Sequence, residues 1–162
     1  MQTFGCEDNH GIARTLAAFG AFTEGLQLFA SFAILMNFQR FGKMKGMGQI
    51  VAWSVRDESL HTESIIRLYH TFVQENPEVK TEDLSRDLYK ICDTIITHED
   101  AFIDLAFGVG GIEGLTAKEV KLYIRYIGDR RLTQLGLQPI YNVGDNPLPW
   151  MDNILNLSLI HI

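Results

Sequence analysis

The chain has 162 residues, of which 46% are hydrophobic and 21% charged, and its formal net charge is −6. This composition is typical of one domain with a real apolar core, and the two distant cysteines, Cys6 and Cys92, exclude a disulfide framework or a zinc knuckle and read as structural thiols. No basic stripe interleaved with aromatic residues and no signal peptide occurs, so we expect a cytoplasmic protein that does not bind nucleic acid.

The first predicted element is a long helix over residues 12–40, with a possible local distortion. Its most apolar run, residues 28–36, is shorter than the roughly 18 residues of a membrane span, so the helix is expected in a core and not in a membrane. After the glycines of FGKMKGMGQ, a second helix is predicted over residues 48–73. Its expected inner face carries five apolar side chains: Trp53, Leu60, Ile65, Leu68 and Phe72.

Two further helices are predicted in the second half of the chain. Thr81 begins a capping pattern ahead of a helix that continues to about residue 107, and Thr116 caps a helix over about residues 117–135. The remainder reads as coil punctuated by prolines. Because no strand-like alternation of useful length occurs, the sequence predicts an all-α fold.

The stretch SVRDESLH places a carboxylate and an imidazole one helical turn apart. Glu58 and His61 are three positions apart, so their side chains project from the same face of the second helix. Carboxylate oxygen and imidazole nitrogen together suit iron or manganese, and Glu-x-x-His is half of the ligand pattern of ferritin-like di-metal bundles. The same spacing also occurs on solvated helix surfaces, so the pair alone leaves both interpretations open.

Glu24 lies within the apolar first helix, where an ionised carboxylate needs a partner. A structural explanation would be an arginine from a neighbouring helix, with Arg56 and Arg67 as candidates; a metal ion is the alternative. The distance from Glu24 to the end of its predicted helix is about 24 Å, and that from the start of the next helix to Glu58 is about 18 Å. In an antiparallel pair the two carboxylates therefore reach similar depth.

Other acidic and histidine clusters do not fit the same site. Glu7 and His10 share the Glu-x-x-His spacing, but a continuous helix would place His10 about 21 Å from Glu24, so we expect chance surface residues. The cluster at residues 98–100, His-Glu-Asp, lacks a glutamate and histidine at ligand spacing and is expected on a solvated face.

Four segments occur in a fixed order along the chain: EGLQLFASF, VRDESLHTE, YIRYIGDRRLTQLGLQPIY and NPLPWM. In these segments the sequence resembles the small, radical-generating subunit of ribonucleotide reductase, over about residues 14–156. The resemblance implies part of a ferritin-like helical bundle, with two ligand-bearing helices and two further helices.

The resemblance also implies roles for four residues. Glu24, Glu58 and His61 match metal ligands of the family. Asp57 matches the aspartate that links a metal-bound histidine to the radical-transfer chain, and it would relay a proton with an electron. From the residues alone, Asp57 could equally pair with Arg56 or a lysine.

The implied function is that of the parent protein. It would use two iron ions, or manganese with iron, and O2 to make a radical for ribonucleotide reduction by the large subunit, as a homodimer bound to that subunit. The alternatives from the residues are another ferritin-like di-metal oxidase or ferroxidase, or a metal-free helical interaction module.

The chain departs from the family in several places. It lacks the two earlier helices with an Asp or Glu, a first Glu-x-x-His and the radical tyrosine, and none of its five tyrosines matches the radical position. Ser54 replaces the usual apolar residue, and the docking tail for the large subunit is missing. The final LSLIHI, residues 157–162, matches the translated end of a transposon-type sequencing adaptor. We therefore expect a fragment with a domain over residues 1–156 and a terminal scar.

Overall fold

The computed structural model describes residues 8–153, and the described chain is all-α, as predicted. The interpretations of Cys6, Glu7 and residues 157–162 lie outside this range. The elements are α1 (Asn9–Ala17), the π-helix η1 (Ala18–Glu24), α2 (Phe29–Arg40), α3 (Lys45–Glu75), the 3-10 helix η2 (Pro77–Val79), α4 (Glu82–Gly108) and α5 (Ala117–Gln134).

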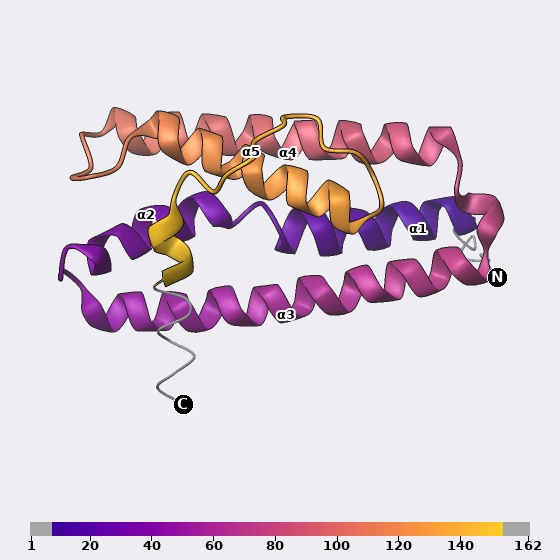
Figure 1. Cartoon of the computed structure of the whole chain (residues 1–162), viewed down its shortest axis with the longest axis horizontal. Coiled ribbons are helices and arrows are strands. Elements are labelled where there is room, and N and C mark those ends of the chain that lie inside the picture. Colours follow the sequence, from indigo (N-terminus) through magenta and orange to yellow (C-terminus); the bar gives the residue numbers. More distant parts are fainter. Residues whose placement is uncertain (1–7, 154–162) are drawn as a thin grey trace, which may run out of the picture.

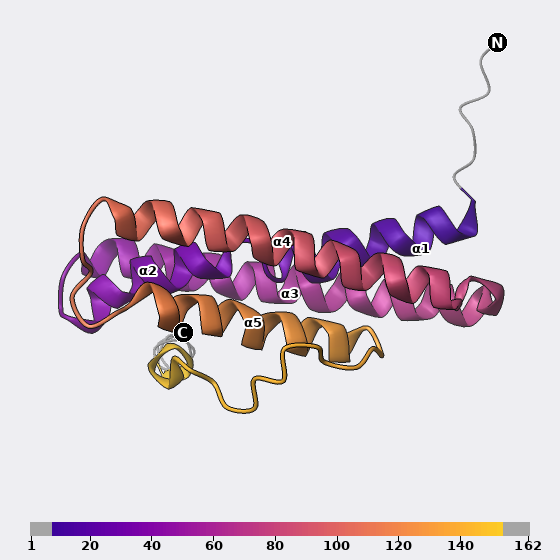
Figure 2. The same ribbon diagram turned by 90° about the horizontal axis from the view of Figure 1, so that it is seen from above.

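The broken helix formed by α1, η1 and α2 occupies the middle of the bundle (Figure 1). It packs against α3 on one side and against α4 and α5 on the other. The view from above shows α4 and α5 running side by side along the same stretch of the broken helix (Figure 2). The central helix is therefore contacted by every other long helix of the described chain.

The expected long helix over residues 12–40 is present but interrupted, so its possible distortion is confirmed. Seven residues from Ala18 to Glu24 form a π-helix, and a turn over residues 25–28 precedes α2. A Cβ added at Gly20 would lie 2.6 Å from the Ile65 Cγ2 atom, so this glycine allows η1 to lie close against α3.

The stretch Asn9–Arg40 is long and apolar enough to cross a membrane by length and composition alone. In this structure 56% of its most apolar window is buried inside the bundle, and core helices of soluble proteins pass the same test. Its apolar character is thus accounted for by helix packing.

The inner face of α3 differs from the predicted one. The buried residues include Val51, Val55 and Ile66, whereas Trp53 and Leu60 are 52% and 62% exposed. Leu68 is also exposed. The prediction was wrong for Trp53, Leu60 and Leu68, because large apolar residues occur on both sides of α3 and hydrophobicity alone could not identify the side that contacts the broken helix. Ile65 and Phe72 are half-buried, in agreement with the prediction.

The starts of α4 and α5 follow the predicted capping patterns. The Leu84 N–H donates to the Thr81 hydroxyl at 3.1 Å, and Thr116 forms a capping box with Glu119. Gly136, with φ of 81°, follows the end of α5 in the left-handed conformation that glycine adopts readily. These local signals place both helices within one or two residues of their predicted limits.

The segment after α5 is mostly coil, as expected, but a short helix covers residues 149–153. Buried Asp129 holds this segment against α5: its Oδ1 accepts from the Ile140 and Tyr141 N–H groups and its Oδ2 from the Val143 N–H, at 2.9 to 3.0 Å. A single carboxylate thus accepts the hydrogen bonds of three loop N–H groups that have no partner in a helix or strand.

Candidate metal centre

Three of the predicted site residues lie together between η1 and α3. One donor atom from each of Glu24, Glu58 and His61 lies within 4.8 Å of the others. The His61 Nδ1 atom is 4.0 Å from Glu24 Oε2 and 3.8 Å from Glu58 Oε2. Two helices that are separate in the sequence therefore bring the carboxylates to the same depth.

Glu24 ends the π-helix, and its side chain is 32% exposed. Its Oε2 atom is nevertheless buried, with no hydrogen-bond donor within reach among residues 8–153. The arginine explanation fails for this part of the chain: Arg67 pairs with Glu63 at 3.3 Å, and no ion pair joins Arg56 to Glu24. A buried carboxylate oxygen without a donor is a position that a cation would stabilise.

Glu58 and His61 come from one turn of α3, and the His61 Nδ1 atom lies within 4.0 Å of an oxygen of each carboxylate. Two oxygens and one imidazole nitrogen form a donor set suited to iron or manganese. Two ligand atoms that each bind one ion at about 2.1 Å lie at most about 4.2 Å apart, and both histidine–carboxylate distances are within this limit. The residues present thus fit such a metal.

Asp57 is not part of the three-residue cluster, although it lies one turn of α3 before His61. Its side chain is exposed and lines an open groove of about 710 Å³ with Trp53, Arg56 and Leu60. In the described chain no hydrogen bond or ion pair joins Asp57 to Arg56 or to a lysine. The structural alternative of a local ion pair is therefore not observed, and the relay role stays a prediction.

His10 does not join the cluster. It lies near the start of α1, in the part of the helix farthest from Glu24, and the three-residue cluster contains no donor from it. Its Nε2 atom is buried without a hydrogen-bond partner among the described residues. Glu7, the other residue of the predicted chance pair, lies outside the described range.

The prediction of a solvated face for residues 98–100 was wrong for two of the three. Glu99 is only 5% exposed, and Asp100 accepts two hydrogen bonds from Arg125, at 2.7 and 2.9 Å. Burial raises the pKa of the Glu99 carboxyl to about 7, while the nearby Ala30 backbone amide lowers it. Both carboxylates face other helices because α4 is covered by the broken helix and by α5.

Replacing Glu99 by glutamine should make the chain more stable at pH 8. The folded-state pKa of Glu99 exceeds the ordinary value, so the folded chain binds more protons at Glu99 than the unfolded chain does. The free energy of unfolding therefore falls as pH rises from about 4 to 7. We expect Glu99→Gln to gain at most about 3 kcal/mol at pH 8 and almost nothing at pH 4.5.

Urea denaturation at fixed protein concentration measures this difference at the two pH values. Glu75→Gln, at an exposed position, is the matched control and should show no such pH dependence. Equal effects of Glu99→Gln at pH 4.5 and pH 8 would show that burial does not raise the pKa of Glu99.

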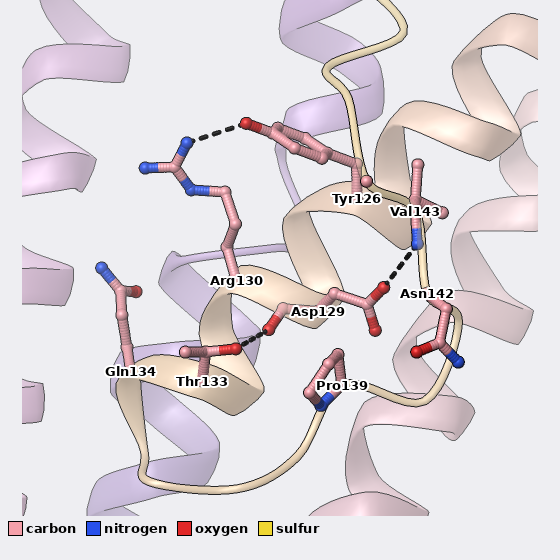
Figure 3. A pocket seen from close by; sticks show the side chains of 9 residues that line it. Tyr126, Asp129, Arg130, Thr133, Gln134, Pro139, Asn142 and Val143 are labelled. Carbon is pink, nitrogen blue, oxygen red and sulfur yellow. Dashed lines mark hydrogen bonds between the residues drawn. The ribbon is translucent and has the colours of Figure 1, made fainter.

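A cavity of about 610 Å³ opens between the end of α5 and the following loop (Figure 3). Its polar groups bond to one another: Arg130 donates to the Tyr126 hydroxyl at 2.9 Å, and the Thr133 hydroxyl donates to the Asp129 carbonyl. None of the predicted site residues lines it. We attribute this cavity to the anchoring of the loop on α5.

Sequence reasoning missed the part that Arg131 plays beside the predicted site. This α5 residue donates to the Gly25 carbonyl, directly after Glu24 in the chain. The available signal was weak: a pair of adjacent arginines, in IGDRRL, within an amphipathic helix. The sequence could not identify its partner, because the two residues are separated by 106 positions.

The arrangement of the helices is that of the ferritin-like fold, as its similarity to solved structures shows. The R2 subunit of ribonucleotide reductase from Clostridium botulinum superposes with a TM-score of 0.81 and 24% identity, over 86% of this chain and 44% of that one. The family described as "Ribonucleotide reductase, small chain" matches residues 1–147. The chain belongs to this family.

Two relatives illustrate the similarity in sequence. The protein of Invertebrate iridescent virus 3 named "Probable ribonucleoside-diphosphate reductase small subunit 048L" is 49% identical over 153 residues, which cover 90% of this chain and 39% of the relative. The subunit beta of the Chlamydia pneumoniae enzyme is 30% identical over 158 residues, or 96% of this chain and 45% of the relative. The chain therefore spans less than half the length of these relatives.

Proposed function

We propose that this chain forms part of a radical-generating small subunit of ribonucleotide reductase, and that Glu24, Glu58 and His61 bind metal in it. The observation that carries the proposal is the convergence of these three side chains around a buried, unpartnered carboxylate oxygen. Membership of the small-chain family supports the same function. No feature of the described residues favours a ferroxidase or a metal-free interaction module.

Two iron ions, or manganese with iron, would supply the oxidation by O2 that makes the radical in the parent protein. Glu24 and Glu58 would provide negative charge for these cations, and the neutral imidazole of His61 would provide a nitrogen ligand. Imidazole and carboxylate groups bind metal in their deprotonated forms, so metal binding should weaken at acidic pH.

Asp57 would relay a proton with an electron between the metal site and the large subunit. Its exposed carboxylate lies on the outer side of α3, next in sequence to the ligand Glu58, where another part of the small subunit can reach it. This role requires a hydrogen-bond partner from outside the described residues. The parent is proposed to act in the cytoplasm as a homodimer bound to the large subunit, without contact to membrane or nucleic acid.

The exposed side of α3 would be covered by other helices of the parent protein. The exposed apolar side chains on this side include Ile50, Trp53, Leu60 and Leu68. Isolated monomers rarely leave such a stripe uncovered. We propose that upstream helices, with an Asp or Glu and a second Glu-x-x-His, pack here and complete the ligand set.

Replacing His61 by alanine tests the proposal in the protein encoded by the intact reading frame. His61→Ala should reduce bound metal, abolish the radical signal and abolish nucleotide reduction with the cognate large subunit, because one of the metal ligands is lost. His98→Ala removes an exposed histidine of α4 and should leave all three unchanged. Normal metal content and a normal radical signal in His61→Ala would refute the ligand assignment.

A further inference from the structure

The turn between η1 and α2 leaves the Gly25 carbonyl without its helical partner. In an α-helix the Phe29 N–H would donate to the Gly25 carbonyl, but here it donates to the Leu26 carbonyl at 3.1 Å. The Gln27 N–H donates to Phe22, five residues back, at 3.1 Å. The Gly25 carbonyl, directly after Glu24, therefore needs a donor from elsewhere.

Arg131 supplies that donor from α5. Its Nε atom donates to the Gly25 carbonyl at 2.7 Å, and its Nη1 atom donates to the Gln134 side-chain oxygen at 2.8 Å. The guanidinium carbon also lies 5.5 Å from the centre of the Phe29 ring. Three contacts thus fix the guanidinium group at the turn.

This placement is energetically unusual for an arginine. Burial and the neighbouring Arg130 lower the pKa of Arg131 to about 10, and no carboxylate of residues 8–153 forms an ion pair with it. A half-buried cation without an acid is unfavourable unless other groups compensate it. The carbonyl end of the π-helix, with its partial negative charge, is the compensating group.

Gly25 is fitted to the same contact. A Cβ added at this residue would lie 2.7 Å from the Arg131 Nε atom and 2.5 Å from the Ala21 carbonyl oxygen. Its φ of −86° is ordinary for any residue, so the glycine is needed here for space and not for backbone conformation. A larger residue would displace the guanidinium from the carbonyl.

We propose that Arg131 is a positioning residue for Glu24. By holding the Gly25 carbonyl, it fixes the last turn of the π-helix and thereby the direction in which the Glu24 side chain points toward Glu58 and His61. Arg131 itself contacts none of the three predicted ligands in the described structure. The effect of Arg131 on metal binding rests on the proposed function, whereas its effect on the turn does not.

The test compares Arg131→Gln with Arg130→Gln in the purified chain. Both variants remove one positive charge from α5, but Arg130 bonds to Tyr126 and has no contact with the turn. Hydrogen exchange measured at Gln27 and Phe29 reports the turn, and Mn²⁺ affinity reports the ligands. Arg131→Gln should speed exchange about tenfold, as expected for loss of one hydrogen bond to a charged group, and weaken Mn²⁺ binding about tenfold or more.

Two further variants keep the test decisive if Arg131→Gln fails to fold. Arg131→Lys retains the charge but cannot hold the Gly25 and Gln134 oxygens together in a planar fork. Gly25→Ala crowds both the guanidinium and the Ala21 carbonyl without changing charge. Each should speed exchange at the turn as Arg131→Gln does. Exchange and Mn²⁺ affinity equal to those of Arg130→Gln in every folded variant would overturn the proposal.

Failure of the proposed function would give a different result. If the unmodified chain binds no Mn²⁺ above the level of Glu24→Gln, the three residues do not bind metal by themselves, and Mn²⁺ affinity no longer reports on Arg131. Exchange at Gln27 and Phe29 then decides by itself whether Arg131 holds the turn: faster exchange in Arg131→Gln supports this, and unchanged exchange refutes it.

Discussion

Ferrous iron and oxygen added to the purified chain should produce neither a stable two-metal centre nor a protein radical. The described residues bring together three donor side chains from two helices, whereas a complete ferritin-like di-metal site takes ligands from four helices. Binding of a single ion should be weak. Nucleotide reduction with a cognate large subunit should therefore be absent.

Metal stoichiometry after gel filtration, the electron paramagnetic resonance spectrum and nucleotide reduction measure these outcomes. The intact small subunit, treated in parallel, is the control. We also expect the chain to self-associate, because apolar side chains such as Phe19, Trp53 and Leu60 are exposed. A stable two-metal centre with a radical would show that copies of the chain complete the site between them, or that Glu7 and His10 contribute to it.

Replacing Asp129 by alanine should destabilise the chain by about 4 kcal/mol. The carboxylate accepts three backbone hydrogen bonds from the loop after α5, and hydrogen bonds to charged groups contribute about 1.5 to 3 kcal/mol each. Part of this is recovered when the freed N–H groups of Ile140, Tyr141 and Val143 reach water. The stability of Asp129→Asn should lie between that of the unmodified chain and that of Asp129→Ala, because asparagine keeps one acceptor oxygen without the charge.

Urea denaturation gives the loss of stability, and hydrogen exchange shows where it arises. In Asp129→Ala, exchange at Ile140, Tyr141 and Val143 should accelerate more than exchange in the helices. Asp145→Ala removes an exposed carboxylate from the same loop and should change neither measurement. Equal stability of Asp129→Ala and Asp145→Ala would mean that the loop is anchored by its apolar contacts alone.

Helix type and helix limits could be predicted where the signals are local. Thr81 and Thr116 cap the helices that follow them, and Gly136 lies just beyond the end of α5. These features depend on residues three or four positions apart, so the sequence contains them directly. The faces of α3 could not be predicted in this way, because apolar residues such as Trp53 and Val55 lie on opposite sides of it.

The convergence of Glu24, Glu58 and His61 could be predicted from the sequence, but the contacts that support it could not. The ligand spacing of Glu58 and His61 is visible within α3, and matching helix depth brought Glu24 to the same level. The contacts of Arg131 with Gly25 and of Arg125 with Asp100 join residues far apart in sequence. Such contacts depend on how helices rotate against one another, which one sequence does not specify.

The π-helix makes the position of Glu24 depend on how the preceding residues are wound as well as on its place in the sequence. A π-turn contains more residues than an α-turn, so each residue advances through a smaller angle around the axis. If Ala18–Glu24 were wound as a regular α-helix, the same sequence would turn the carboxylate toward a different neighbour. The number of residues between Ala17 and the turn thus helps to determine the direction of the Glu24 side chain. Gain or loss of one residue there would change the partner of Glu24, while many substitutions that preserve the winding would not.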